Sequence, residues 1–146
     1  MSFEFRKEYI KDYVAPYGQE IMHGKIALEE HYESPQWEAT GDPQNETARN
    51  KEDYFEAVKA RLHSADIRIA DMDRNGVEMF IMSLTQPGIQ EVLDTKEAVK
   101  RAHEMNIWIY ENYIQKHPKR FNAFAAVAMQ DPEAACEELE FCVKEL

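Results

Sequence analysis

The stretch NGVEMFIMSLTQPG, residues 75 to 88, decides the fold class of this chain. Val77 to Leu84 is a nearly continuous apolar run, which fits a strand buried on both faces of a parallel sheet. Asn75-Gly76 in front of it is typical of a helix end with a left-handed cap, and Pro87-Gly88 behind it breaks the strand. The stretch therefore predicts a helix followed by a buried strand.

The same alternation extends in both directions along the chain. Lys25 to Leu28 and Asn122 to Ala128 are short apolar runs that predict two more strands. Helices are expected to start near Asp53, Asp94 and Asp131, the second with a capping box and the third with a proline at its first position. Strand and helix in strict alternation predict parallel strands joined by right-handed helical crossovers, an α/β fold.

Each expected helix carries one apolar stripe at helical spacing. The first runs unbroken from Asp53 to Asn75-Gly76, and the second reaches about Lys116. The stripes are, in chain order, Phe55, Val58, Leu62, Ala65, Ile69 and Met72; Ala98, Ala102, Met105, Ile109 and Tyr113; and Ala135, Leu139, Cys142, Val143 and Leu146.

Length and charge narrow the classes of protein. The 146 residues predict one domain, and 44% hydrophobic residues suffice for a packed core. A formal net charge of −11 argues against binding nucleic acid or an anionic membrane surface. No apolar run approaches the ~20 residues of a membrane span, and the first ten residues lack the apolar region of a secretion signal. We therefore expect a soluble, cytoplasmic protein.

Two side chains with metal-binding chemistry end the first expected strand. Because side chains alternate along a strand, Ala27, Glu29 and His31 are expected on one face and Ile26, Leu28 and Glu30 on the other. A carboxylate and an imidazole at the carboxyl end of a parallel strand make a plausible ligand pair, at the edge where α/β folds place their sites. The spacing alone also fits two side chains that simply meet solvent.

Other polar patterns in the sequence are weaker evidence for a functional site. Residues 71 to 76 imitate the first half of a calcium loop, but Met82 stands where a glutamate ligand is required. His103-Glu104 does not continue into a zinc motif because Ile107 occupies the second histidine position, so His103 is expected to be a solvated helix residue. The acidic run from Asp131 to Glu145 is interpreted as a solvated helix face.

Three segments in order resemble the amidohydrolase-related, metal-dependent, non-oxidative aromatic acid decarboxylases. They are GKIALEEHY at 24 to 32, RIADMDRNGVEMFIMSLTQPGIQEVLD at 68 to 94, and HPKRFNAFAAVAMQDPEAACEELEFCV at 117 to 143. The family fold is a TIM (β/α)8 barrel, so the resemblance implies the first three parallel βα units of a truncated barrel at residues 24 to 146. Residues 1 to 23 are expected to form an N-terminal arm outside it.

The resemblance implies a site that this chain holds only in part. Glu29 and His31 correspond to two ligands of a divalent metal, Zn or Mn, while the other ligands and the catalytic acid are expected beyond Leu146. Glu29 stands where related hydrolases carry the first histidine of His-x-His, which favours the dihydroxybenzoate-type branch. Residues 83 to 88 and 129 to 130 would line the mouth. The substrate-contacting residues implied are Ala27, Ser83, Thr85 and Pro87.

The function implied is that of a carbon–carbon lyase, a carboxy-lyase. The metal would chelate the carboxylate and ortho-hydroxyl of a small aromatic acid, an acid would protonate the ring carbon, and carbon dioxide would leave. We expect the isolated chain to be inactive and the full-length form to be a homo-oligomer. A metal-dependent hydrolase of the same superfamily, and a non-catalytic remnant or binding module, remain as alternatives.

Overall fold

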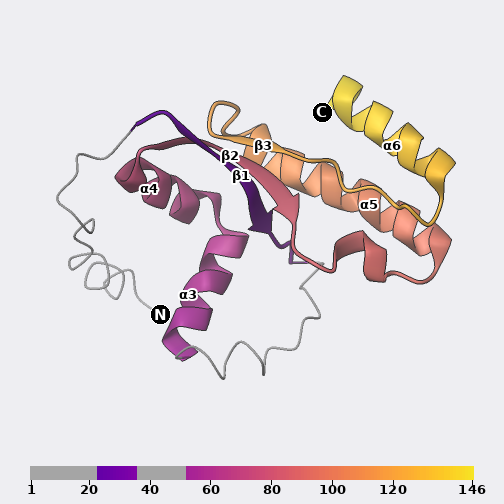
Figure 1. Ribbon diagram of the computed structural model, residues 1–146, viewed down its shortest axis with the longest axis horizontal. Coiled ribbons are helices and arrows are strands. Elements are labelled where there is room, and N and C mark those ends of the chain that lie inside the picture. The colour runs from indigo at the N-terminus through magenta and orange to yellow at the C-terminus, as the bar shows by residue number, and fades with distance from the viewer. Residues whose placement is uncertain (1–22, 36–51) are drawn as a thin grey trace.

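The computed structural model describes residues 23–35 and 52–146. Its sheet has three strands in the order β1-β2-β3, and both pairs are parallel, as the sequence predicts. Figure 1 shows the strands side by side, with α5 along them and α6 beyond α5. The elements are β1 (Lys25–Tyr32), α3 (Glu52–His63), α4 (Ala65–Asn75), β2 (Val77–Leu84), η1 (Gly88–Glu91), α5 (Thr95–Ile109), η2 (Tyr110–Ile114), β3 (Phe121–Ala123) and α6 (Pro132–Glu145).

The main core lies between the sheet and its helices. Met82 of β2 is fully buried against Met72 of α4 and Ile109 of α5. Tyr113 follows α5 and meets the ring of Phe121 edge-on, with centroids 5.1 Å apart. These contacts fix both crossover helices on one face of the sheet, since large aromatic and thioether side chains there bury most of the apolar surface.

The helix starts at Asp94 and Asp131 and the helix end at Gly76 form where the sequence places them, whereas α5 ends at Ile109 and continues as η2 to Ile114 in place of one helix to about Lys116. The side chains of Asp94 and Asp131 cap α5 and α6 by accepting from backbone N–H groups, and Gly76 closes α4 at φ 68°. The predicted helix from Asp53 to Asn75 is wrong as a single element. Ser64 adopts an extended conformation, and its hydroxyl accepts from the N–H of Ile67, which begins a second helix.

The predicted apolar stripe is buried on α5 but only partly buried on α6. All five stripe residues predicted for α5 and its continuation are buried: Ala98, Ala102, Met105, Ile109 and Tyr113. On α6 the prediction is partly wrong, because Ala135 is buried while Leu139 and Val143 are exposed. These two side chains line an open groove. Their spacing therefore predicted an apolar helix face correctly, but the described residues do not bury that face.

The third strand is shorter than predicted. Its ladder covers Phe121–Ala123, and only the N–H of Phe124 continues it, to Met82. Beyond this point the side chain of Asn106 takes both backbone groups of Ala126, at 2.8 Å each. An amide side chain thus replaces the neighbouring strand, which is why residues 124 to 128 leave the sheet. Sequence periodicity carries no signal for such a replacement.

The face of β1 and β2 opposite these helices is open. Ile26 and Leu28 are 60% and 65% exposed, and Phe124 beyond β3 is half exposed. The described helices are all too short or too polar to cross a membrane. The predicted N-terminal arm, except for His23, lies outside the described residues.

This exposed apolar face predicts self-association of the purified chain. Sedimentation equilibrium should give a weight-average mass that rises with concentration above the 17.1 kDa of one chain. Replacing Ile26 and Leu28 by lysine should lower that mass, because each charge opposes burial of the face. A concentration-independent monomer for the unsubstituted chain would contradict the expectation.

Candidate metal and substrate site

His31 lies at the carboxyl end of β1 and meets β2. It stands in register with Ser83, and the Ser83 Oγ lies 3.2 Å from His31 Nδ1. The neighbouring pair, Tyr32 and Leu84, packs toward the helices, so His31 and Ser83 face the open side of the sheet. The structure therefore joins one predicted metal ligand to one predicted substrate-contacting residue.

Glu29 lies in a bulge, and the bulge corrects the predicted face assignment. Ala27 is in register with Phe80, but Glu30 is in register with Met82, so β1 carries one residue more than β2 between them. Glu29 is exposed and takes φ 61°, a left-handed conformation that is uncommon outside glycine.

The bulge reverses the alternation of side chains along β1. Glu30 and Phe80 both contact Arg68 of α4, which places Glu30 and Ala27 on the helix-covered face. The prediction that Ala27 shares a face with His31 is therefore wrong. The prediction that Glu30 shares a face with the exposed Ile26 and Leu28 is wrong for the same reason. The extra residue between Ala27 and Glu30 moves every later side chain of β1 to the face opposite the predicted one. A prediction from strict alternation cannot include such an extra residue.

Arg68 holds the carboxyl end of β1 from the helix-covered face of the sheet. This buried side chain on α4 donates to the carbonyl oxygen of His31 and, at 2.7 Å, to that of Arg61. The Glu30 carboxylate lies 3.9 Å from its guanidinium. Burial lowers the pKa of Arg68, and the nearby Tyr113 and Glu30 oppose that shift. One guanidinium thus connects α3, α4 and the backbone of the candidate ligand.

Thr85 fixes the residue that follows His31. Its N–H and its hydroxyl both donate to the carbonyl oxygen of Tyr32, at 3.0 and 2.8 Å. The hydroxyl of Thr85 is therefore engaged in holding β1 to the end of β2. Its predicted contact with substrate stays a prediction.

A hollow of about 190 Å³ opens beside Ser83. It is bounded by the end of β2 and by the chain after β3, and its lining includes Ser83, Pro87 and Phe124. The Gln86–Pro87 peptide bond is cis. Two of the four predicted substrate-contacting residues, Ser83 and Pro87, therefore line one hollow at the carboxyl edge of the sheet.

The loops at this edge are tied to each other. The Gln130 Nε2 donates to the carbonyl oxygens of Ile89 and Val92, at 2.8 and 2.9 Å. This side chain joins the turn after β3, which is predicted to line the mouth, to the chain just beyond the other predicted segment, residues 83 to 88. Asn106 fixes Ala126 between them. Gln130 lies in a segment that the sequence indicates, whereas this role of Asn106 was not identified from the sequence.

A second polar cluster lies between α5 and α6, away from His31. The Glu138 carboxylate, only 11% exposed, accepts from Asn106 at 2.8 Å and lies 2.9 Å from His103 Nδ1. The expectation that Glu138 belongs to a solvated face is wrong, because helix packing turns this carboxylate inward. His103 remains 45% exposed, as expected for a solvated helix residue, although its ring also contacts Glu138.

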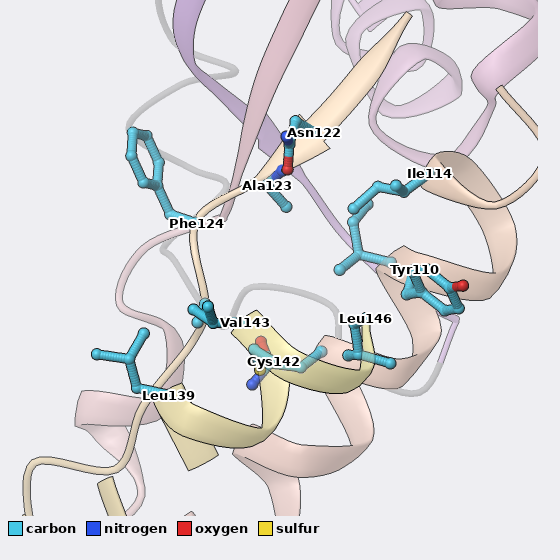
Figure 2. Close-up of a pocket in the computed structure, with 12 residues that line it drawn as sticks. Tyr110, Ile114, Asn122, Ala123, Phe124, Leu139, Cys142, Val143 and Leu146 are labelled. Atoms are coloured by element: carbon cyan, nitrogen blue, oxygen red, sulfur yellow. The ribbon is translucent and has the colours of Figure 1, made fainter. Parts of the chain in front are cut away.

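A larger groove of about 450 Å³ lies beside this cluster, between β3, α5 and α6 (Figure 2). Leu139, Val143 and Leu146 line one side, and Ala123 lies across from them, while the ring of Phe124 points away from the groove. The lining is mostly apolar and does not include Glu29, His31 or Ser83. This groove is therefore separate from the candidate site despite its size.

The described residues supply only part of a metal site. Among residues 23–35 and 52–146, no three His, Cys, Asp or Glu side chains are grouped so that they could hold a metal ion. Glu29 and His31 offer one carboxylate and one imidazole, which are suitable ligand types for a divalent first-row metal. These two donors fit such a metal chemically but would form only part of its ligand set.

Comparison with known proteins finds relatives of the chain. No protein-family model matches the chain. The γ-resorcylate decarboxylase of Polaromonas sp. is 41% identical over 127 residues, which cover 86% of this chain and 37% of that protein. The chain therefore spans about a third of the length of the curated relatives it matches.

Solved structures give the same result for the fold. The dihydroxybenzoic acid decarboxylase of Polaromonas sp., with bound manganese and the inhibitor 2-nitroresorcinol, superposes with TM-score 0.72 at 38% identity, over 85% of this chain and 36% of that one. The chain is similar to the N-terminal part of this decarboxylase fold. A 2,6-dihydroxybenzoate decarboxylase complexed with 2,6-dihydroxybenzoate gives the same TM-score and identity, over 85% and 37%.

The comparisons confirm the predicted fold class, a partial TIM barrel that begins with three parallel βα units. They also confirm the resemblance to metal-dependent carboxy-lyases, since these relatives are named as decarboxylases. Bound manganese in a related structure supports a divalent metal rather than zinc in particular. The assignment of individual site residues stays a prediction.

The buried guanidinium predicts a large loss of stability on substitution. Arg68→Met keeps much of the side-chain volume but leaves the carbonyl oxygens of His31 and Arg61 without their donor. The free energy of unfolding should fall by about 2–4 kcal/mol, since each buried group left unsatisfied costs about 1–3 kcal/mol. Urea unfolding followed by circular dichroism measures this, with the exposed Lys100→Met as the control. Equal stability of the two variants would contradict the role of Arg68.

The two cysteines should react at very different rates. Burial, with the Glu138 carboxylate as the second cause, raises the pKa of the Cys142 thiol to about 12, whereas Cys136 is exposed. At pH 8 almost none of Cys142 is thiolate, so iodoacetamide should alkylate it about 100-fold or more slowly than an ordinary exposed thiol. Mass spectrometry of timed samples measures both rates. Similar rates in the folded chain, with the same reagent alkylating both in guanidinium, would contradict the expectation.

Proposed function

We propose that this chain is the N-terminal segment of a metal-dependent, non-oxidative decarboxylase of the dihydroxybenzoate type. The observation that carries the proposal is the position of His31 at the carboxyl end of β1, two residues after Glu29 and in contact with Ser83, which lines the hollow. Parallel α/β folds place their sites at this edge. Relatives at about 40% identity that are named γ-resorcylate decarboxylases support it.

Glu29 and His31 would hold a divalent cation. A carboxylate oxygen and an imidazole nitrogen suit manganese, and a relative with bound manganese favours that metal over zinc. When bound, the cation would supply Lewis-acid polarisation and a template for the substrate carboxylate. The remaining ligands and the acid that protonates the ring are proposed to lie outside the described residues.

The other residues of the edge would shape the site. Arg68 and Thr85 hold the backbone on either side of the His31–Tyr32 bond, so the imidazole keeps one position relative to Ser83. Pro87 and Ser83 line the hollow, where a small aromatic acid would lie. Contact of Ala27 with substrate is the least supported, because Ala27 is on the helix-covered face.

The ligand type at residue 29 separates this proposal from the hydrolase alternative. A carboxylate there favours the dihydroxybenzoate branch, whereas related hydrolases carry His-x-His on their first strand. The proposal includes a small aromatic carboxylic acid as substrate, and a homo-oligomeric, cytoplasmic form for the full-length protein. The isolated chain should release no carbon dioxide from 2,6-dihydroxybenzoate, because the donor of the ring proton is expected elsewhere.

A chimera tests the proposal. Residues 24–146 would replace the aligned N-terminal segment of the Polaromonas enzyme, and manganese content and carbon dioxide release would be measured. Glu29→Ala and His31→Ala should each lose manganese and activity together, by about 100-fold or more in activity, since a site of few ligands keeps little affinity after losing one. Glu30→Ala on the opposite face is the matched control and should retain metal. Full manganese content in both ligand variants would refute the assignment.

A further inference from the structure

The side chains of Ser83 and His31 meet across β1 and β2 at the candidate site. Ser83 lies in β2 next to Met82, which is fully buried, so its backbone position is set by the core. Its Oγ lies 3.2 Å from His31 Nδ1, and this contact engages one of the two ring nitrogens. The other ring nitrogen, Nε2, is therefore the one available to a ligand.

A neutral imidazole binds a cation only through the nitrogen that lacks a proton. If Nε2 binds the cation, Nδ1 must carry the proton and requires an acceptor. A serine hydroxyl can accept this proton while its own hydrogen points elsewhere, and it can donate to Nδ1 when the proton sits on Nε2. Ser83 is thus suited to His31 both with and without a bound cation.

We infer that Ser83 is a positioning residue that accepts a hydrogen bond from His31 Nδ1–H and so presents Nε2 to a divalent cation. This inference rests on the proposed function, because it takes His31 as a ligand. It gives Ser83 a role different from the substrate contact predicted from the sequence. Arg68 fixes the carbonyl oxygen of His31 and Ser83 fixes its ring, so backbone and side chain are held by separate groups.

The two roles of Ser83 separate in their kinetic effects. A positioning hydroxyl acts on the affinity for the cation, whereas a hydroxyl that touches substrate acts on the KM at saturating metal. Partners that orient a ligating histidine typically contribute about 10–100-fold in metal affinity or activity. The test must therefore measure metal binding by itself.

The experiment compares three substitutions in the chimera described above, with the free Mn²⁺ signal followed by electron paramagnetic resonance. Ser83→Ala should raise the dissociation constant for Mn²⁺ by about 10-fold or more. Ser83→Thr and Ser83→Val form the matched pair, since they share shape and strand preference and differ in the hydroxyl. Thr should restore affinity to within about 2-fold, and Val should not. Circular dichroism of the metal-free proteins checks that the fold is equal.

The outcomes distinguish this inference from the proposed function. If Thr and Val bind Mn²⁺ equally well, or if Ser83→Ala changes only the KM for 2,6-dihydroxybenzoate, the positioning role is overturned while the metal site stands. If His31→Ala binds Mn²⁺ as tightly as the unsubstituted chimera, the ligand assignment itself falls. An unsubstituted chimera that binds no Mn²⁺ overturns both.

Discussion

The candidate site depends on the hydrogen bonds that the buried guanidinium of Arg68 donates. This guanidinium is held by the carbonyl oxygens of His31 and Arg61, and the carboxylate of Glu30 lies nearby. Taking such a charge out of water is costly, and the cost is offset only when its donors are satisfied. The guanidinium therefore fixes the position of α3 and α4 against the end of β1. The backbone that carries His31 inherits this rigidity.

Much of the fold could be predicted because it rests on local patterns. The run from Val77 to Leu84 forms β2 with the predicted bounds, and Asp94 and Asp131 cap the helices that follow them. The failures occur where a side chain replaces a backbone interaction. The Ser64 hydroxyl starts a new helix within a continuous stripe, and the Asn106 amide takes Ala126 out of the sheet. Neither event alters hydrophobic periodicity, so periodicity cannot signal it.

The candidate site, too, could be predicted in part and not in full. The residue types and their place at a strand end indicated Glu29 and His31, and the parallel pairing that the structure confirms is what places Ser83 beside His31. The faces could not be predicted, because the bulge between Ala27 and Glu30 adds one residue to β1 alone. Glu29 takes its left-handed conformation within this bulge. Strain at such a position is maintained only where the surrounding structure holds it, which here means the β1–β2 ladder on both sides.

Charge gives the proposed metal a further role. The chain carries a net charge of −11, and under the proposed function Glu29 would add a carboxylate to the site that an anionic aromatic acid would have to approach. Two carboxylates in one site repel each other, so the edge without a cation would disfavour its own proposed substrate. A divalent cation held by Glu29 and His31 would reverse the local sign, because a bound ion is the largest charge in such a site. Under the proposed function, the acidic ligand therefore has a consequence that a second histidine would lack. It makes substrate affinity depend on the metal more strongly than a neutral ligand pair would.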